Sequence, residues 1–182
     1  IDPERDIRMT IIEAGPRILA ALPYLRGRVL DYGCGVGARA PHVPADRYLG
    51  FDHDAESIQQ AALRHPHHAF TTLPPPNDRF DTVVALALIE HLPNPVEFLR
   101  RCRDLLEERG RLVLTTPHPR GERAHALGAR LGLFSRAAVR EHGRLLDHQA
   151  IRGVALEAGL RVTGYRQFLI GFNQLAVFEL PR

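Results

Sequence analysis

Asp31 is followed by glycines at alternate positions, Gly33, Gly35 and Gly37, and it is preceded by a short apolar run that favours a β-strand. Glycine lacks the Cβ atom that keeps a ligand away from the main chain, and it accepts positive φ angles that other residues resist. The spacing therefore predicts a strand that leads into a loop whose backbone contacts a ligand of nucleotide size.

Two classes of nucleotide site fit this loop. The dinucleotide fingerprint G-x-G-x-x-G/A is satisfied by Gly33, Gly35 and Ala38. Asp31 favours a cationic ligand instead, because its carboxylate would repel a pyrophosphate and attract an ammonium or sulfonium group by roughly 1 to 4 kcal/mol at about 4 Å. Two prolines after the loop leave little room for the regular helix whose N-terminus a pyrophosphate site uses. The glycine pattern alone leaves both classes open.

A second acid, Asp52, ends the next β-prone run, at residues 47–51. An acid at the tip of a second strand is placed to accept hydrogen bonds from ribose hydroxyls. Dinucleotide enzymes share this feature, so Asp52 indicates a ribose without deciding the rest of the ligand.

Candidates for acid–base chemistry follow two later apolar runs. The run at residues 80–86 is nearly continuous, as expected of a buried central parallel strand, and Glu90 and His91 follow it. His118 follows a second run, at residues 110–117. Ligands of open α/β sheets bind outside the carboxyl ends of the strands. Each histidine is therefore a candidate for substrate contact or proton acceptance, with a structural, hydrogen-bonded histidine as the alternative.

Four motifs stand in order between residues 25 and 118. They are Val-Leu-Asp-Tyr-Gly-Cys-Gly-Val-Gly, Gly-Phe-Asp-His-Asp, the apolar run that ends in Glu-His-Leu, and Gly-Arg-Leu-Val-Leu-Thr-Thr-Pro. Together they resemble the class I S-adenosylmethionine-dependent methyltransferases, in particular the branch that acts on small molecules and lipid-like quinone precursors.

The resemblance implies an α/β fold. This is a three-layer sandwich around a Rossmann-like, seven-stranded, mostly parallel sheet of order 3-2-1-4-5-7-6 with an antiparallel last strand. The β-prone residues 161–167 and 173–180, joined near Gly171, suit the terminal hairpin of this topology. At 182 residues the chain is expected to be one methyltransferase domain, residues 1–182.

Helical periodicity and capping residues predict the elements around the sheet. Residues 1–25 are expected to form an N-terminal helical cover, which Gly15 and Pro16 divide in two. The resemblance implies that residues 118–145, between the fifth strand and the last helix, form a lid on the substrate side. The remaining helices are predicted at residues 54–64, 96–108 and 145–158, the second of them as a cover helix only.

The resemblance also implies a reaction, which is transfer of the methyl group of S-adenosylmethionine to an oxygen, nitrogen or carbon nucleophile of a small-molecule acceptor by in-line displacement. S-adenosylhomocysteine is the product, and His118 and His91, in that order, are the predicted catalytic residues. A non-catalytic S-adenosylmethionine-binding module and an NAD-type oxidoreductase are the alternatives. The predicted cofactor-binding residues are Asp31, Tyr32, Gly33, Cys34, Gly35, Asp52, His53, Thr72, Leu73, Leu86 and Ala87.

The adenine end of the expected site departs from the family pattern. Relatives carry an acid or amide shortly before the Leu-Pro step at residues 73–74, where this chain has Ala69 or Phe70. We therefore expect the adenine to be held by backbone groups and by apolar contact with residues 70–73.

Composition excludes several other functions. The chain contains no lysine, which excludes a Schiff-base lysine mechanism. Cys34 and Cys102 lack zinc-ligand spacing, and the histidines at 65–68 lack further ligands, so no metal is predicted. No apolar run approaches the ~18 residues of a membrane span and no signal-peptide pattern opens the chain, so a soluble cytoplasmic protein without a membrane partner is expected.

Residues 120–144 include six arginines. Their charge is expected either to attract an anionic acceptor or to form a solvated basic face. Aromatic residues interleave with basic ones too rarely to favour a nucleic-acid partner.

Overall fold

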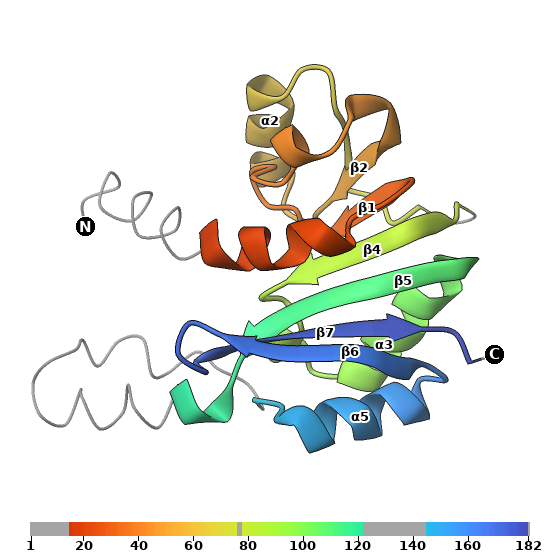
Figure 1. Cartoon of the computed structure of the whole chain (residues 1–182). Helices are drawn as coiled ribbons and strands as arrows, with labels where there is room; N and C mark the ends of the chain where they lie inside the picture. Colours follow the sequence, from red (N-terminus) through yellow and green to blue (C-terminus); the bar gives the residue numbers. More distant parts are fainter. Residues whose placement is uncertain (1–14, 76–77, 122–144, 182) are drawn as a thin grey trace, which may run out of the picture.

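A single seven-stranded sheet organises the chain, and the computed structural model describes residues 15–75, 78–121 and 145–181. The strands lie in the order β3-β2-β1-β4-β5-β7-β6, as predicted (Figure 1). The pairs from β3 to β5 are parallel, and β7 pairs antiparallel with both β5 and β6. The strands are β1 (Val29–Tyr32), β2 (Tyr48–Phe51), β3 (Ala69–Thr71), β4 (Phe80–Leu86), β5 (Leu106–Pro117), β6 (Arg161–Phe168) and β7 (Asn173–Glu179).

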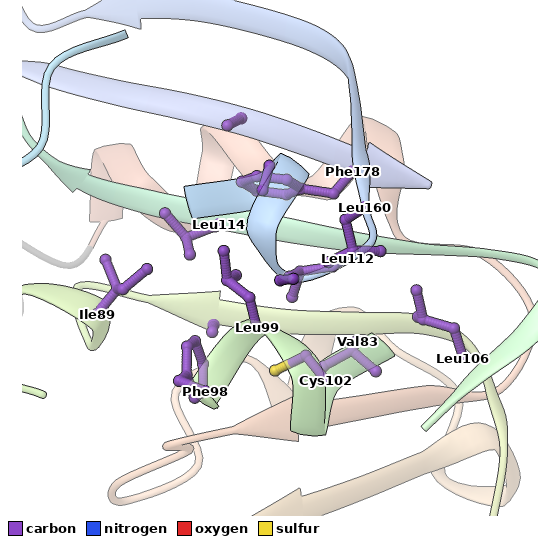
Figure 2. Close-up of a cluster of buried hydrophobic side chains, with 14 of the residues drawn as sticks. Val83, Ile89, Phe98, Leu99, Cys102, Leu106, Leu112, Leu114, Leu160 and Phe178 are labelled. Atoms are coloured by element: carbon purple, nitrogen blue, oxygen red, sulfur yellow. The ribbon is translucent and has the colours of Figure 1, made fainter. Parts of the chain in front are cut away.

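Helices cover both faces of the sheet, which confirms the predicted three layers. On one face, α3 (Pro95–Asp104) and α5 (His148–Glu157) bury a core of aliphatic and aromatic side chains against β4, β5 and β7. Figure 2 shows Leu99 and Cys102 of α3 within this core. On the other face, Ile18 and Ala21 of a helical segment at residues 15–21 pack against β1, β4 and β5. The carboxyl ends of β1, β2 and β4 lie at one pocket.

Capping residues set the start of two helices. α2 (Ala55–Arg64) begins after Asp54, whose carboxylate accepts a hydrogen bond from the Ser57 N–H at 3.0 Å, as predicted. α5 begins three residues later than predicted, because Asp147 is its N-cap and accepts from the Ala150 N–H at 2.8 Å. Gly159, with a φ of 73°, follows its end.

The helix predicted at residues 96–108 is too long at its C-terminal end. α3 stops at Asp104, and the next residues belong to β5 because Leu106 pairs with Phe80 of β4. A Cβ at Gly110 would lie 2.8 Å from the Phe80 carbonyl oxygen, so the glycine allows the strand to bend closely here. Strand pairing therefore overrides the helix propensity of a Leu-Leu-Glu-Glu-Arg run.

Short 3₁₀ turns occupy the connection between β1 and β2, where the prolines predicted little regular helix. They are η2 (Ala40–His42) and η3 (Ala45–Arg47), and a third, η1 (Leu22–Tyr24), precedes β1. Residues 1–14 of the predicted cover and residues 122–144 of the predicted lid lie outside the described residues. Within the described parts of the chain, no helix has the length and apolar character needed to span a membrane.

Candidate cofactor and acceptor site

The glycine loop after β1 is attached to the end of β2 by backbone hydrogen bonds. The N–H groups of Gly33 and Cys34 donate to the Phe51 carbonyl at 2.8 and 3.0 Å. Gly33 and Gly35 have φ angles of 76° and 52°, which other residues rarely adopt. No described atom lies within 4 Å of the place where a Gly35 Cβ would stand. This side of the loop is therefore open to a ligand.

Asp31 lies behind the loop, fully buried, and both of its carboxylate oxygens accept hydrogen bonds. Arg39 Nε donates to Oδ1 at 2.6 Å, and the Tyr48 hydroxyl donates to Oδ2 at 2.7 Å. Arg39 also donates to the Gly33 carbonyl at 2.8 Å, so the ion pair fixes the loop conformation. Burial disfavours the charged guanidinium, but Asp31 outweighs burial and raises the pKa of Arg39. Burial, reinforced by Asp31, raises the pKa of Tyr48.

This ion pair corrects the electrostatic argument made from the sequence. Arg39 balances the charge that was assigned to Asp31 alone, so the attraction of Asp31 for a sulfonium is weaker than that of an isolated carboxylate. Sequence reasoning missed Arg39 and Tyr48, because neither belongs to a motif that names a partner for Asp31. The signal that could have found this ion pair is an arginine close in sequence to an acid that is expected to be buried.

Asp52 stands at the tip of β2 with its carboxylate oriented by backbone groups. The Gly35 N–H donates to Oδ2 at 2.8 Å, and the Asp54 N–H donates to Oδ1 at 3.1 Å. His53 Nδ1 lies 3.3 Å from Oδ1, and the Asp52 side chain is 13% exposed. Each carboxylate oxygen has a further lone pair, so Asp52 can accept hydrogen bonds from a ligand while it holds the loop.

A pocket of about 550 Å³ opens over the loop and the ends of β1, β2 and β4. Its volume lies within the roughly 300–1,000 Å³ of small-molecule sites. The structure brings together in it most of the cofactor-binding residues predicted from the sequence. These are Tyr32, Gly33, Gly35, Asp52, His53, Leu86 and Ala87.

Helix α3 contributes side chains to the same pocket, so the interpretation of this segment as only a cover helix is wrong. Glu97, Phe98 and Arg101 line the pocket. The Tyr32 ring packs edge-on against Phe51 and Phe98, with centroids 4.8 and 5.3 Å apart. Phe98 belongs to the apolar stripe predicted for this helix, but the stripe alone does not indicate which of its residues extend from the core into the pocket.

Ala87 carries backbone strain at the edge of the pocket. Its φ is 52°, and its N–H donates to the Thr115 carbonyl of the neighbouring strand at 2.9 Å. A left-handed alanine costs roughly 1–2 kcal/mol, and such strain gathers at functional sites. The sequence predicted Ala87 as a pocket residue but gave no signal of this conformation.

The other predicted cofactor-binding residues do not line the pocket. Thr72 and Leu73 lie at the surface, Leu73 with 73% exposure, and Asp31 and Cys34 lie behind the loop. Burial raises the pKa of the Cys34 thiol to about 12, so the thiol stays protonated near neutral pH. Phe70, expected beside the adenine, packs where Gly50 lacks a Cβ, 2.5 Å from that position.

His118 follows β5 and is buried. Its backbone N–H donates to the Phe172 carbonyl at 2.8 Å. Its ring Nδ1 accepts from the backbone N–H of Arg120 at 3.1 Å. Burial lowers the pKa of His118, Arg120 lowers it further, and Asp147 opposes them. A neutral His118 with Nδ1 engaged in this way carries its proton on Nε2 and presents a hydrogen-bond donor there.

Buried polar groups surround the end of β5, and of these the sequence pointed to Glu90 but not to Gln174 or Tyr165. Glu90 is 3% exposed and accepts a hydrogen bond from Thr116 Oγ1 at 3.0 Å. Gln174 of β7 is fully buried, and its amide donates to the carbonyls of Pro117 and Leu146. The Tyr165 hydroxyl donates to Gln174 Oε1 at 2.9 Å, which completes the amide's bonding. No local motif marks Gln174 or Tyr165, since their partners come from distant elements.

His91 lies on a separate pocket of about 810 Å³ between α3 and α5, together with Glu90. His118 is not among the residues that line this pocket. Within residues 15–75, 78–121 and 145–181, no three histidine, cysteine or acidic side chains come together as a metal site would require.

The sheet order, the glycine loop and the acid at the end of β2 define a class I S-adenosylmethionine-dependent methyltransferase. A family model described as a methyltransferase domain matches residues 5–164. The chain therefore belongs to this family.

Individual relatives match part of the chain. A tRNA U34 carboxymethyltransferase of Shewanella putrefaciens is 36% identical over 107 residues, which are 52% of this chain and 32% of that protein. A ubiquinone biosynthesis O-methyltransferase of Cereibacter sphaeroides is 29% identical over 108 residues, 53% of this chain and 44% of that protein. The chain thus spans less than half the length of these relatives.

Solved structures show the same fold. The magnesium protoporphyrin IX methyltransferase of Synechocystis PCC 6803 with bound SAH has a TM-score of 0.71 at 18% identity, and the alignment covers 100% of this chain and 89% of that chain. At this identity the likeness concerns the fold alone.

Proposed function

We propose that the chain transfers the methyl group of S-adenosylmethionine to a small-molecule acceptor at the carboxyl ends of β4 and β5. One observation carries the proposal. The glycine loop, the tip of β2 and the end of β4 converge on a single pocket through Gly35, Asp52 and Ala87. This is the arrangement that a ligand with an amino-acid end and a ribose requires.

The residues present fit this cofactor. The open space beside Gly35 admits the methionine end, and Asp52 has lone pairs for the ribose hydroxyls. His53, Leu86 and Leu88 line the part of the pocket proposed for the adenosine. The adenine contact predicted for Thr72 and Leu73 stays a prediction.

Asp31 and Cys34 are proposed to act on the cofactor through the loop. Asp31 orients Arg39, which holds the Gly33 carbonyl, and the Cys34 N–H shares the Phe51 carbonyl with that of Gly33. Loss of either interaction would change the backbone that contacts the methionine end.

S-adenosylmethionine, when bound, supplies a methyl carbon activated by the adjacent sulfonium, to which the acceptor's lone pair forms a bond as the carbon–sulfur bond breaks. The chain aligns the acceptor and excludes water, for which effective molarities of about 10⁵ M or more are attainable. A base is needed only for a hydroxyl or a similarly weak acid.

His118 and His91 are the proposed residues for acceptor contact, in that order. Neutral His118 donates from Nε2 to an acceptor oxygen, and it takes up a proton at Nδ1 only after its bond to the Arg120 N–H breaks. Arg120 is the one residue among the six arginines at 120–144 that lies in the described residues, and it would favour an anionic acceptor beside His118.

Two measurements test the proposed function. Calorimetry with S-adenosylmethionine and with NAD should show binding of the first only, and preference for NAD would overturn the cofactor assignment. Methyl-labelled cofactor is then offered to phenols, small carboxylic acids and tRNA. Both substrate types are tested because the relatives named above include enzymes of each. Label should enter a small molecule and not tRNA. Binding without turnover on any acceptor would leave a cofactor-binding module.

A further inference from the structure

The turn between β6 and β7 carries exposed apolar side chains, and we call residues 169–172 the apolar tip. Leu169 is 43% exposed, Ile170 is 96% exposed and Phe172 is 44% exposed. Apolar side chains that gather at one place on a surface usually mark a binding site, whereas single exposed ones do not. The tip therefore needs a different explanation from Leu63 or Leu156, which stand alone on helices α2 and α5.

The backbone of the apolar tip disfavours the residues that it carries. Leu169 and Ile170 have φ angles of 52° and 57°, ahead of Gly171 at 83°. The Gly171 N–H donates to the Phe168 carbonyl at 3.1 Å, so the turn is hydrogen-bonded. Turns with positive φ angles at both central residues favour asparagine and glycine, and β-branched isoleucine is a marked exception. Neither local propensity nor packing against the described residues accounts for isoleucine at position 170.

Arginines flank the apolar tip. Arg120 is exposed and precedes Gly121, whose Cβ position lies 3.1 Å from the Phe172 Cβ. Arg166 of β6 is also exposed, with its guanidinium 6.0 Å from the Phe168 ring centroid; one of its NH2 groups donates to the Ala20 carbonyl at 2.7 Å, and its other N–H groups are left for a further partner. An apolar tip between exposed cations complements a surface that is apolar within and anionic at its boundary.

We propose that the apolar tip inserts into an anionic lipid surface, with Arg120 and Arg166 against the lipid phosphates. The expectation of no membrane partner rested on the lack of a spanning segment, and contact with one leaflet does not need such a segment. A second copy of the chain fits the tip less well, because a twofold contact through it would bring the same arginines toward each other.

The location of the tip links lipid contact to the site. The His118 N–H donates to the Phe172 carbonyl at 2.8 Å, so the tip stands directly beside the proposed acceptor region. An enzyme held at lipid in this way would meet acceptors that partition there. This last step rests on the proposed function, whereas lipid contact itself does not.

Flotation of the whole chain with vesicles tests the proposal. Vesicles of phosphatidylcholine with phosphatidylglycerol should bind the chain, vesicles of phosphatidylcholine alone should bind it less, and high salt should weaken the binding. Ile170→Asn should lower the partition coefficient about tenfold or more, since a largely apolar contact is lost. Leu156→Gln, which removes an exposed aliphatic side chain on helix α5, should leave binding unchanged.

Ile170→Gly separates lipid contact from folding. Glycine accepts the left-handed φ, so this variant should melt at or above the temperature of the unchanged chain and yet bind vesicles as weakly as Ile170→Asn. Equal vesicle binding by the unchanged chain and Ile170→Asn would overturn the proposal. Absence of vesicle binding, or self-association that Ile170→Asn abolishes in its place, would overturn it as well. Calorimetry with S-adenosylmethionine on the same samples reports on the cofactor site independently.

Discussion

The glycine loop after β1 and the carboxyl end of β5 both belong to the proposed site, but they are held in opposite ways. In the loop, positive φ angles and backbone donors make the binding surface, and Asp31 and Arg39 lock it from behind. At the end of β5, a buried amide and carboxylate, Gln174 and Glu90, connect strands and loops through side chains. The loop is proposed to contact the cofactor through its backbone, whereas the side chains at the end of β5 are proposed to lie beside the acceptor.

The difference has an energetic side. A buried ion pair loses most when one partner is removed, because the other charge then stays uncompensated. A buried neutral amide leaves only unsatisfied dipoles, which cost less. Substitutions in the two regions should therefore differ in size and in what they change.

Arg39→Met should give the largest effect, because it leaves Asp31 buried and without its cation. We expect the free energy of unfolding in urea to fall by about 3–5 kcal/mol. Arg28→Met is the control, since Arg28 pairs with Asp78 at the surface and should change stability by less than about 1 kcal/mol. Equal losses in the two variants would contradict the structural role of the buried pair.

Gln174→Leu should come next, with a loss of about 2–3 kcal/mol in the free energy of unfolding. Leucine fills the space but leaves the carbonyls of Pro117 and Leu146 without their donor. Gln167→Leu, at an exposed position of β6, should stay within about 0.5 kcal/mol of the unchanged chain. A neutral result at Gln174 would show that the buried amide does not hold the end of β5.

Asp52→Ala should act on the ligand more than on the fold. We expect the affinity for S-adenosylmethionine, measured by calorimetry, to fall about 10- to 100-fold, because hydrogen bonds to a charged group are lost. Asp54→Ala removes a neighbouring acid that caps α2, so it should lower stability by about 1 kcal/mol and leave affinity unchanged. Unchanged affinity in Asp52→Ala would remove the cofactor assignment.

His118 should give the smallest effect, a pH dependence of stability. Burial and Arg120 lower its pKa below the ordinary value of 6.5, so the unfolded chain binds the proton more readily than the folded chain. The stabilisation is complete above pH 6.5 and is lost as the pH falls from there toward the lower folded pKa. Urea unfolding between about pH 7 and pH 5 should therefore show a steeper loss for the unchanged chain than for His118→Asn. Parallel curves would show that His118 titrates alike in both states.

Local patterns predicted much of the fold. The apolar run at residues 80–86 is β4, Asp54 caps α2 as expected, and the two C-terminal strands form the hairpin at the edge of the sheet. The errors lie at the ends of elements, because a residue distant in the sequence determines where an element stops. Leu106 leaves the predicted helix because Phe80 offers it a place in the sheet. The catalytic roles of His118 and His91 stay predictions.

The sequence by itself determined the glycine loop, the acid at the tip of β2 and the apolar central strand, because glycine spacing and apolar periodicity act on neighbouring residues, and the strand order followed from the family resemblance that these motifs carry. Only the tertiary structure decided that Arg39 and Tyr48 neutralise and bond Asp31, that α3 lines the pocket with Phe98, and that Ile170 stands exposed beside His118. These arrangements join residues that are distant in the chain or depend on which face of an element is left uncovered. Strand register and packing fix them, and neither leaves a local pattern in the sequence.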